Sequence, residues 1–229
     1  MQIQAIKVRR LYLEVAGQIK QMITSGELAP GQRLPPERDL AKKFEVSRPT
    51  IREAMIALEI DGQIEIRPGA GSFISANPNG AQEHGLPLKD EGPGSFEILE
   101  ARRIIEAEAA ALAAARITQE QIERLDAVFR DIEEEGNAGS VSEESDQAFH
   151  CLIAEASQNS ALVSSVRWLW ELRLRSAGGQ LFHQRVREGG VHPSVEQHRQ
   201  ILLAIKNRDP LGARNAMESH LTQAISRIQ

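Results

Sequence analysis

The sequence has a single cysteine and few aromatic residues. Among its 229 residues, Cys151 is the one cysteine, and aromatic side chains make up 4% of the chain. One cysteine excludes an intrachain disulfide and favours a reducing compartment. The scarcity of aromatic residues, together with abundant alanine and leucine, favours helices over sheets.

The chain also lacks long apolar segments. No run of about 18 apolar residues occurs, which predicts that no segment spans a membrane. The N-terminal region is polar and basic and has no apolar core of an export signal, so the predicted location is cytoplasmic. The length and a hydrophobic fraction of 41% are typical of a globular protein with two domains.

Acidic residues are unevenly distributed. The formal net charge is −5, which taken alone argues against nucleic-acid binding. Residues 1–75 carry 11 Lys/Arg and 9 Asp/Glu, a balance of +2, whereas residues 76–229 carry 16 and 23, a balance of −7. This asymmetry suits a DNA-binding head on an acidic body, although a solvated charge pattern without a partner would look similar.

The first 75 residues predict three helices followed by a β-hairpin. Apolar residues at helical spacing predict a first helix over 8–25. The pair Pro35-Pro36 opens a second helix over 35–44, and Ser47 caps a third over 47–60. Strand-like segments at 64–66 and 72–74 flank a glycine-rich tip. This order predicts a winged helix-turn-helix DNA-binding domain over residues 1–75.

Three arginines of this domain suit base recognition. Arg48 and Arg52 lie four residues apart at the start of the third helix, so their side chains point the same way. Together with Arg38 they suit guanine, because an arginine fork bonds two base acceptors and discriminates by about 1–3 kcal/mol. Phosphate contacts are expected from short side chains and the wing tip: Ser47, Thr50, Gly69 and Gly71. The alternative is that Arg38 and Arg52 pair with neighbouring glutamates on a solvated surface.

The remainder of the chain predicts a linker and a helical body. Residues 76–95 are rich in Asn, Pro, Gly and charge, which is typical of a linker. Residues 96–229 show helical patterns only and predict an all-α helical bundle, so the fold class is mainly α. The predicted helices are 96–116, 118–135, 143–157, 160–176, 194–207 and 210–228.

Four residues from three predicted helices could gather around one metal ion. Asp146 and His150 are four residues apart and face the same way, while His198 and His220 lie in the last two helices. Three imidazoles and one carboxylate suit zinc, nickel, manganese or iron better than calcium or magnesium. By spacing alone, unconnected surface or core histidines are the more frequent outcome.

The motifs of the N-terminal domain resemble those of GntR-type bacterial transcription regulators. Four segments carry the resemblance: 34–40, 46–54, 58–62 and 69–73. The resemblance implies that Arg38, Arg48 and Arg52 contact operator DNA, and that the wing enters the minor groove.

The helical body is similar to the all-helical, effector-binding (FCD) C-terminal domain of the FadR-type branch of that family. The segments that carry the similarity are 100–114, 146–159, 198–205 and 216–221. It implies that the Asp146, His150, His198 and His220 set holds a divalent metal. It also implies that Arg102 grips a ligand carboxylate, for which a guanidinium is well shaped.

Each further effector candidate has an alternative role. Arg102 could instead pair with Glu106 on the helix surface, and Asn159 could cap the following helix. Arg173 is expected to line the effector pocket. Trp168 and Trp170 lie two positions apart and face different sides of a helix, so at most one of them should reach the pocket.

Together these features predict a ligand-responsive repressor with no enzymatic activity. It would bind a palindromic operator as a homodimer, with a small carboxylate or sugar acid near the metal. Residues 94–102 resemble hexuronate-utilisation repressors, which implies a glucuronate-, galacturonate- or fructuronate-like effector. One alternative is a metal-dependent hydrolase or isomerase acting on a sugar acid. Another is an architectural DNA-binding protein with a structural metal.

Overall fold

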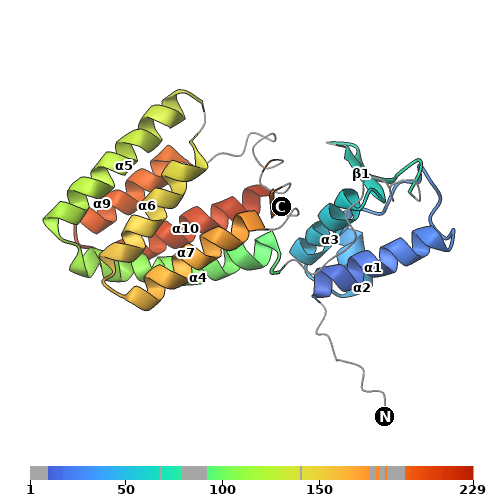
Figure 1. The fold of residues 1–229 in the computed structure, drawn as a ribbon, viewed down its shortest axis with the longest axis horizontal. Coiled ribbons are helices and arrows are strands. Elements are labelled where there is room, and N and C mark those ends of the chain that lie inside the picture. The colour runs from blue at the N-terminus through green and yellow to red at the C-terminus, as the bar shows by residue number, and fades with distance from the viewer. Residues whose placement is uncertain are drawn as a thin grey trace, which may run out of the picture. The chain divides into compact units, whose positions relative to one another are not determined.

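The chain divides into two compact units, here called the head and the helical unit. The computed structural model describes residues 10–67, 69–78, 92–139, 141–175, 179–180, 184 and 194–228. The head comprises Met1–Phe96 with Ser176–Phe182, and the helical unit comprises Glu97–Arg175 with His183–Gln229. Figure 1 shows a small sheet in the head and helices alone in the described part of the helical unit. The predicted fold class, mainly α, is confirmed.

The head begins with three helices: α1 (Leu11–Thr24), α2 (Glu37–Phe44) and α3 (Arg48–Ile60). The turn between α2 and α3 is short because Glu45 adopts a left-handed conformation, with φ of 54°, directly after α2. Ser47 then caps α3, its side-chain oxygen accepting a hydrogen bond from the backbone N–H of Thr50 at 3.2 Å. The predicted cap thus fixes the first turn of α3, which begins with Arg48, and Arg52 follows one turn later.

A two-stranded antiparallel hairpin follows α3. Strand β1 (Ile64–Arg67) pairs with β2 (Gly71–Ile74) so that Ile64 lies opposite Ile74, and both isoleucines are buried in the core of the head. Glycine is required at position 71, because φ is +105° and a Cβ atom would come within 3.1 Å of Arg33 Nε. The backbone N–H of Leu34 donates to the carbonyl of Ser72 at 2.9 Å, which holds the hairpin against the segment that precedes α2.

Six described helices form the helical unit: α4 (Ser95–Arg116), α5 (Gln119–Asn137), α6 (Glu143–Ala156), α7 (Ser160–Arg175), α9 (Val195–Lys206) and α10 (Pro210–Ile228). The predicted capping box at the start of α5 is present, with Thr118 and Gln121 each bonding the other's backbone N–H. Helix α4 begins at Ser95, inside the segment expected to be linker. Residues 79–91 of that segment lie outside the described residues.

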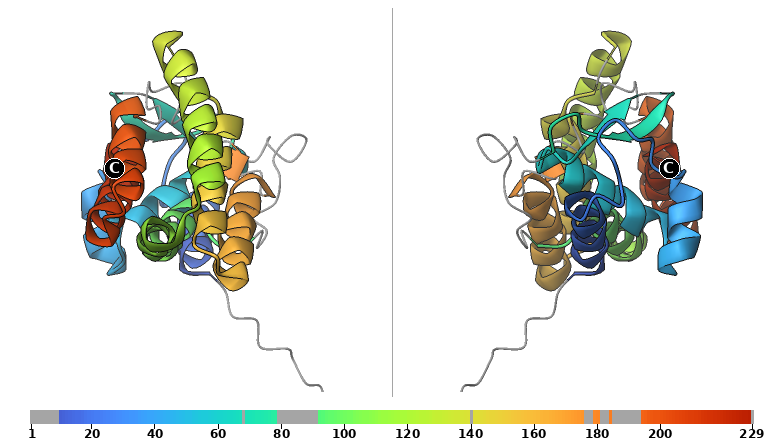
Figure 2. Two further views of the ribbon diagram at one scale, coloured as in Figure 1. Left: turned by 90° about the vertical axis from the view of Figure 1, so that its left-hand side faces the viewer. Right: turned by 90° about the vertical axis from the view of Figure 1, so that its right-hand side faces the viewer.

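Helix α4 contacts both α7 and α10 in the helical unit. It packs on α7 through Ile98, Leu169 and Leu172, and ion pairs such as Arg103–Glu218 join it to α10 (Figures 1 and 2). Buried alanines along α4 are small enough to let neighbouring helices approach closely. Among the helices that the structure describes, none combines the length and hydrophobicity that crossing a bilayer requires.

Candidate functional site

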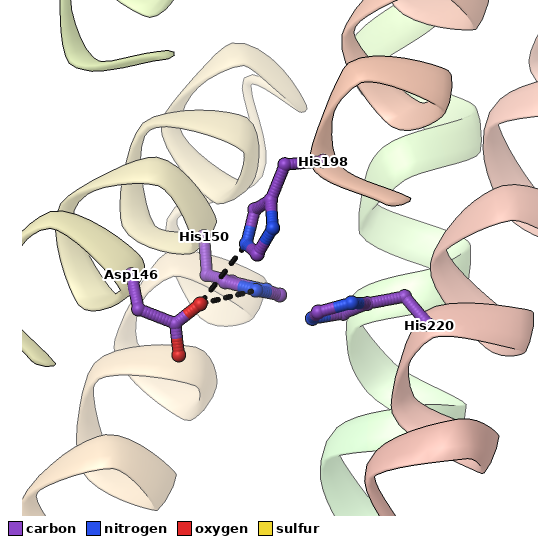
Figure 3. Close-up of side chains that lie close together, drawn as sticks. All are labelled: Asp146, His150, His198 and His220. Carbon is purple, nitrogen blue, oxygen red and sulfur yellow. Dashed lines mark hydrogen bonds and ion pairs between the residues drawn. The ribbon is translucent and has the colours of Figure 1, made fainter. Parts of the chain in front are cut away.

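The structure brings together the four residues expected to bind a metal. Asp146 and His150 project from α6, His198 from α9 and His220 from α10, and the side chains point toward one another (Figure 3). One ligand atom from each residue lies within 4.8 Å of the corresponding atoms of the other three. All four residues are at most 5% exposed. Burial of three imidazoles around a carboxylate needs a physical reason, because such groups lose hydration inside a helical core.

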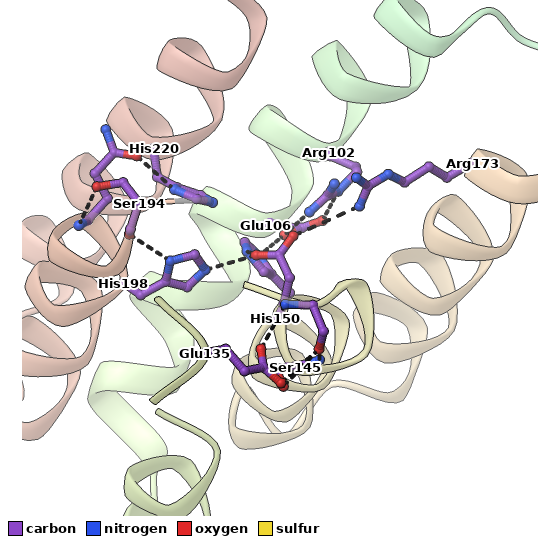
Figure 4. Close-up of polar contacts among 12 residues, drawn as sticks. Arg102, Glu106, Glu135, Ser145, His150, Arg173, Ser194, His198 and His220 are labelled. Carbon is purple, nitrogen blue, oxygen red and sulfur yellow. Dashed lines mark hydrogen bonds and ion pairs between the residues drawn. The ribbon is translucent and has the colours of Figure 1, made fainter. Parts of the chain in front are cut away.

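The ring nitrogen Nδ1 of each histidine faces an oxygen atom. His198 Nδ1 lies 2.9 Å from the backbone carbonyl of Ser194, and His220 Nδ1 lies 3.1 Å from the side-chain oxygen of Gln197. His150 Nδ1 bonds the carboxylate of Glu106 (Figure 4). Carbonyl and carboxylate oxygens only accept hydrogen bonds, so each Nδ1 carries the proton and donates it. A ring whose proton lies on Nδ1 can offer the lone pair of its Nε2, as metal-bound histidines do.

Two of these Nε2 atoms have no hydrogen-bond donor facing their lone pair among the described residues. His198 Nε2 lies 2.9 Å from Asp146 Oδ1, where two lone pairs face each other unless a proton or a cation lies between them. Two ligands at right angles around a transition-metal ion are about 3 Å apart, so this spacing fits shared coordination. His150 Nε2 is buried and has no hydrogen-bond partner among the described residues. The donor set thus fits a divalent transition metal.

Electrostatics within the cluster favour the metal-binding forms of Asp146 and His220. Burial alone would raise the pKa of Asp146, but a proton between it and His198 Nε2, and the positive charge of the three imidazoles when they are protonated, hold it below its usual range. Burial lowers the pKa of His220 well below that of a free histidine, and the neighbouring His198 and His150 lower it further. At neutral pH, Asp146 is therefore ionised and His220 is neutral.

Glu106 belongs to the site, although it was not predicted from the sequence. It is 1% exposed, accepts a hydrogen bond from Arg102 Nε at 2.6 Å, and accepts another from His150 (Figure 4). Burial would raise its pKa, but Arg102 and His150 overcome this and lower the pKa to about 2. A sequence signal exists, because Arg102 and Glu106 fall on the same helical face as the buried Ala109, Ala110 and Ala113.

The alternative expected for Arg102, an ion pair with Glu106 on the helix surface, is confirmed for the pair and wrong for its location. The pair forms, but it is buried and not on the helix surface. Arg102 also stacks on Trp170, with its guanidinium carbon 3.9 Å from the ring centroid, and Arg173 lies over the same ring at 4.8 Å. Arg173 Nη1 lies 3.9 Å from Asp146 Oδ2, which places this arginine beside the four candidate metal ligands. Both arginines expected to bind the effector therefore adjoin the four candidate ligands.

The other effector candidates differ in their positions: Trp168 lies on the surface, Trp170 is buried beside Arg102, and Asn159 caps a helix. Trp168 is 52% exposed whereas Trp170 is 3% exposed, so the two rings do face different sides of α7. Asn159 precedes α7, and its side-chain oxygen accepts hydrogen bonds from the backbone N–H groups of Ala161 and Leu162 at 3.1 and 3.3 Å. Asn159 thus acts as the helix cap that was its alternative role.

Cys151 provides a test of the environment around Glu106. Burial raises the pKa of this thiol to about 11, and the negative charge of Glu106 adds to the rise. At pH 8 the thiolate fraction of Cys151 is then about 100-fold lower than that of an ordinary cysteine. A thiolate of higher pKa is also more nucleophilic, which recovers about half of this loss in the logarithm of the reaction rate. We expect a disulfide reagent at pH 8 to react about tenfold more slowly with the native protein than with the chain in guanidinium chloride. Equal rates would contradict this assignment.

The expected DNA-contacting residues lie at the start of α3, on α2 and in the wing. Arg38 and Arg48 are exposed. Arg52 forms two hydrogen bonds to the carboxylate of Glu37 on α2, at 3.0 and 2.7 Å, so the expected alternative of a glutamate pair is realised for this arginine. The hydroxyls of Ser47 and Thr50 lie 2.7 Å apart and bond each other. Gly69, with φ of +72°, is exposed at the wing tip, and Gly71 begins β2.

Both units match known protein families. Residues 11–74 match the model of the gntR family of bacterial regulatory proteins, and residues 97–223 match the FCD domain. The chain belongs to the GntR family of bacterial regulators. The resemblance noted in the sequence is therefore confirmed for both units. This GntR-family protein is a transcription regulator, and the alternative of a hydrolase or isomerase is wrong.

Characterised regulators are similar to this GntR-family protein along most of its length. The Uxu operon transcriptional regulator of Escherichia coli strain K12 is 36% identical over 231 aligned positions, which cover 98% of this chain and 89% of that protein. The Exu regulon transcriptional regulator of the same strain is 35% identical over 214 positions, which cover 93% and 82%. A solved structure of Streptococcus agalactiae GntR is 28% identical, with coverage of 93% and 98% and a TM-score of 0.45.

Proposed function

We propose that this regulator is a repressor that binds a palindromic operator as a homodimer and responds to a sugar acid held beside a divalent metal. The observation that carries the effector part is the convergence of Asp146 and one ring nitrogen from each of three histidines next to a buried arginine. A cation and a guanidinium side by side suit an anionic ligand that also carries oxygen donors for the metal.

In the proposed site, Asp146, His150, His198 and His220 hold the metal. A nitrogen-rich set of this kind suits zinc, nickel, manganese or iron. When bound, the metal supplies a positive charge and coordination positions for ligand oxygens. The oxygens that accept from each Nδ1 keep the rings turned toward the cluster, so the protein pays no reorientation cost on binding.

Arg102 and Arg173 are the proposed partners of the effector carboxylate. The Nε1–H of Trp170 is buried and has no hydrogen-bond acceptor within the described part of the chain, so it is suited to donate to a ligand oxygen. The similarity of residues 94–102 to hexuronate-utilisation repressors supports a hexuronate, as does the similarity to the Uxu and Exu regulators. We leave Asn159 out of the proposed site because its side-chain oxygen serves the cap of α7.

The head is proposed to read DNA with Arg38, Arg48 and Arg52. The start of α3 also offers phosphate contacts, because its backbone N–H groups attract anions and the hydroxyls of Ser47 and Thr50 can donate. Gly69 and Gly71 keep the wing narrow enough for close approach to the sugar-phosphate backbone. An effector that binds the DNA-free conformation more tightly than the DNA-bound one lowers DNA affinity by the ratio of its two affinities, typically about 5- to 150-fold.

One titration tests this proposal. Operator sequences are selected from a random duplex pool, and binding of the zinc-loaded protein is followed by fluorescence anisotropy at a fixed, moderate salt concentration. D-glucuronate or D-galacturonate should lower the affinity of the selected duplex, and acetate at equal concentration should not. Affinity that is indifferent to both hexuronates would instead support an architectural DNA-binding protein with a structural metal. No selected duplex at all would refute the DNA-binding part.

A further inference from the structure

We infer that Glu106 is a positioning residue that links His150, one of the four candidate metal ligands, to Arg102, the proposed contact of the effector carboxylate. The inference rests on the proposed function, because it assigns a role to Glu106 within that site. Glu106 is the one described residue that hydrogen-bonds both a candidate metal ligand, His150, and a candidate effector contact, Arg102. Figure 4 shows its carboxylate between the two side chains.

The two oxygens of Glu106 serve different partners. Oε1 accepts from Arg102 Nε at 2.6 Å, and Oε2 accepts from His150 Nδ1. Oε2 also lies 3.5 Å from Arg102 Nη2, at the outer limit of a hydrogen bond. The carboxylate therefore fixes the tautomer and the rotation of His150, and it holds Arg102 mainly by a single N–H group.

This arrangement leaves one end of the arginine available. Trp170 covers a face of the guanidinium and Glu106 engages its Nε edge, while Nη1 forms no hydrogen bond with any described residue. An arginine fork binds a carboxylate best through two parallel N–H groups. Glu106 and Trp170 together thus orient Arg102 so that its Nη end is presented to a ligand.

Sharing one carboxylate makes the two partners depend on each other. When His150 Nε2 donates its lone pair to a cation, its Nδ1–H becomes a stronger hydrogen-bond donor. Glu106 Oε2 is then drawn toward His150, and its 3.5 Å contact with Arg102 Nη2 weakens further. Nη2 of Arg102 thereby becomes available to a ligand when the four candidate ligands hold a metal, while Nε stays bonded to Oε1. A buried ion pair with a purely structural role would show no such dependence.

The first test measures binding of Zn²⁺ alone by competition with a chromophoric chelator. Glu106→Gln keeps the size of the side chain but presents an amide, and it should weaken Zn²⁺ binding about 10- to 100-fold, as expected for loss of a partner that orients a metal-bound histidine. Arg102→Met should instead strengthen Zn²⁺ binding, because it removes the partner that competes with His150 for Glu106 Oε2. The matched control is Glu108→Gln, on the same helix, whose exposed carboxylate pairs with Arg214.

The second test uses Trp170 as a reporter of Arg102 in a Trp168→Phe background. Zn²⁺ should change Trp170 fluorescence in the background protein, because the guanidinium lies directly over the ring. Most of that change should be lost in Glu106→Gln and also in Arg102→Met; whatever change Arg102→Met retains is a direct effect of the cation on the ring.

The outcomes separate this inference from the proposed function. No Zn²⁺ binding by the wild type would refute the proposed metal site. Tight Zn²⁺ binding that Glu106→Gln leaves unchanged would overturn the inference alone. If Glu106→Gln does not fold, the double variant Arg102→Met/Glu106→Gln removes the buried charge pair as a unit. This double variant should again bind Zn²⁺ about 10- to 100-fold more weakly; wild-type affinity would overturn the inference.

Discussion

Replacing His198 by alanine is expected to abolish tight metal binding and most of the stabilisation that a metal confers. The change removes one of four candidate ligands, and it removes the atom that lies 2.9 Å from Asp146 Oδ1. The loss of affinity should exceed the 10- to 100-fold typical of a residue that only orients a ligand. At a metal concentration about 1,000 times the dissociation constant, binding adds about 4.1 kcal/mol to the free energy of unfolding; a 100-fold weaker site adds about 1.4 kcal/mol.

The control for this variant is the same melting experiment in excess chelator. His198 packs against Phe149, with ring centroids 5.0 Å apart, so its removal also costs packing energy that does not involve a metal. The difference between wild type and variant should therefore be larger with Zn²⁺ or Ni²⁺ than with chelator, and the excess measures the contribution of the metal. A variant that retains stoichiometric metal after dialysis, measured by elemental analysis, would show that His198 is not a ligand.

Local sequence signals were sufficient to predict most elements of the fold. The Ser47 cap and the Thr118–Gln121 capping box start their helices where expected, because a cap bonds backbone N–H groups within three residues. The hairpin register follows from alternating apolar residues, Ile64 and Ile74, around a tip with φ-positive glycines. The start of α4 was less predictable. Ser95 is helical although it follows a segment of linker composition.

The site was less accessible to sequence reasoning than the fold. Spacing places only Asp146 and His150 on one face of one helix; His198 and His220 were candidates from their predicted helices, and the resemblance to known effector domains implied that all four hold one metal. Glu106 was missed because its carboxylate faces a histidine 44 positions away. Spacing of four residues predicts its pair with Arg102 but says nothing of burial. Which polar pairs are buried depends on packing between helices distant in sequence.

Arg52→Ala is expected to weaken binding to the selected operator by about 1–3 kcal/mol, or about 5- to 150-fold, and to flatten base preference at one position of each half-site. Arg52 lies on the same face of α3 as Arg48, one turn further along the helix that is expected to enter the major groove. Anisotropy titrations against the operator and against single-base variants measure both effects. Arg130→Ala, an exposed arginine on α5, is the control for loss of one positive charge.

The ion pair between Arg52 and Glu37 supplies the sharper control. If Arg52 acts only by joining α2 to α3, Glu37→Gln should reproduce the loss, because it weakens the same pair. If Arg52 contacts DNA, Glu37→Gln should leave affinity unchanged or raise it, since it releases the guanidinium and removes a negative charge near the phosphates. Equal losses in Glu37→Gln and Arg52→Ala, with base preference intact, would make Arg52 a structural residue and leave base recognition to Arg38 and Arg48.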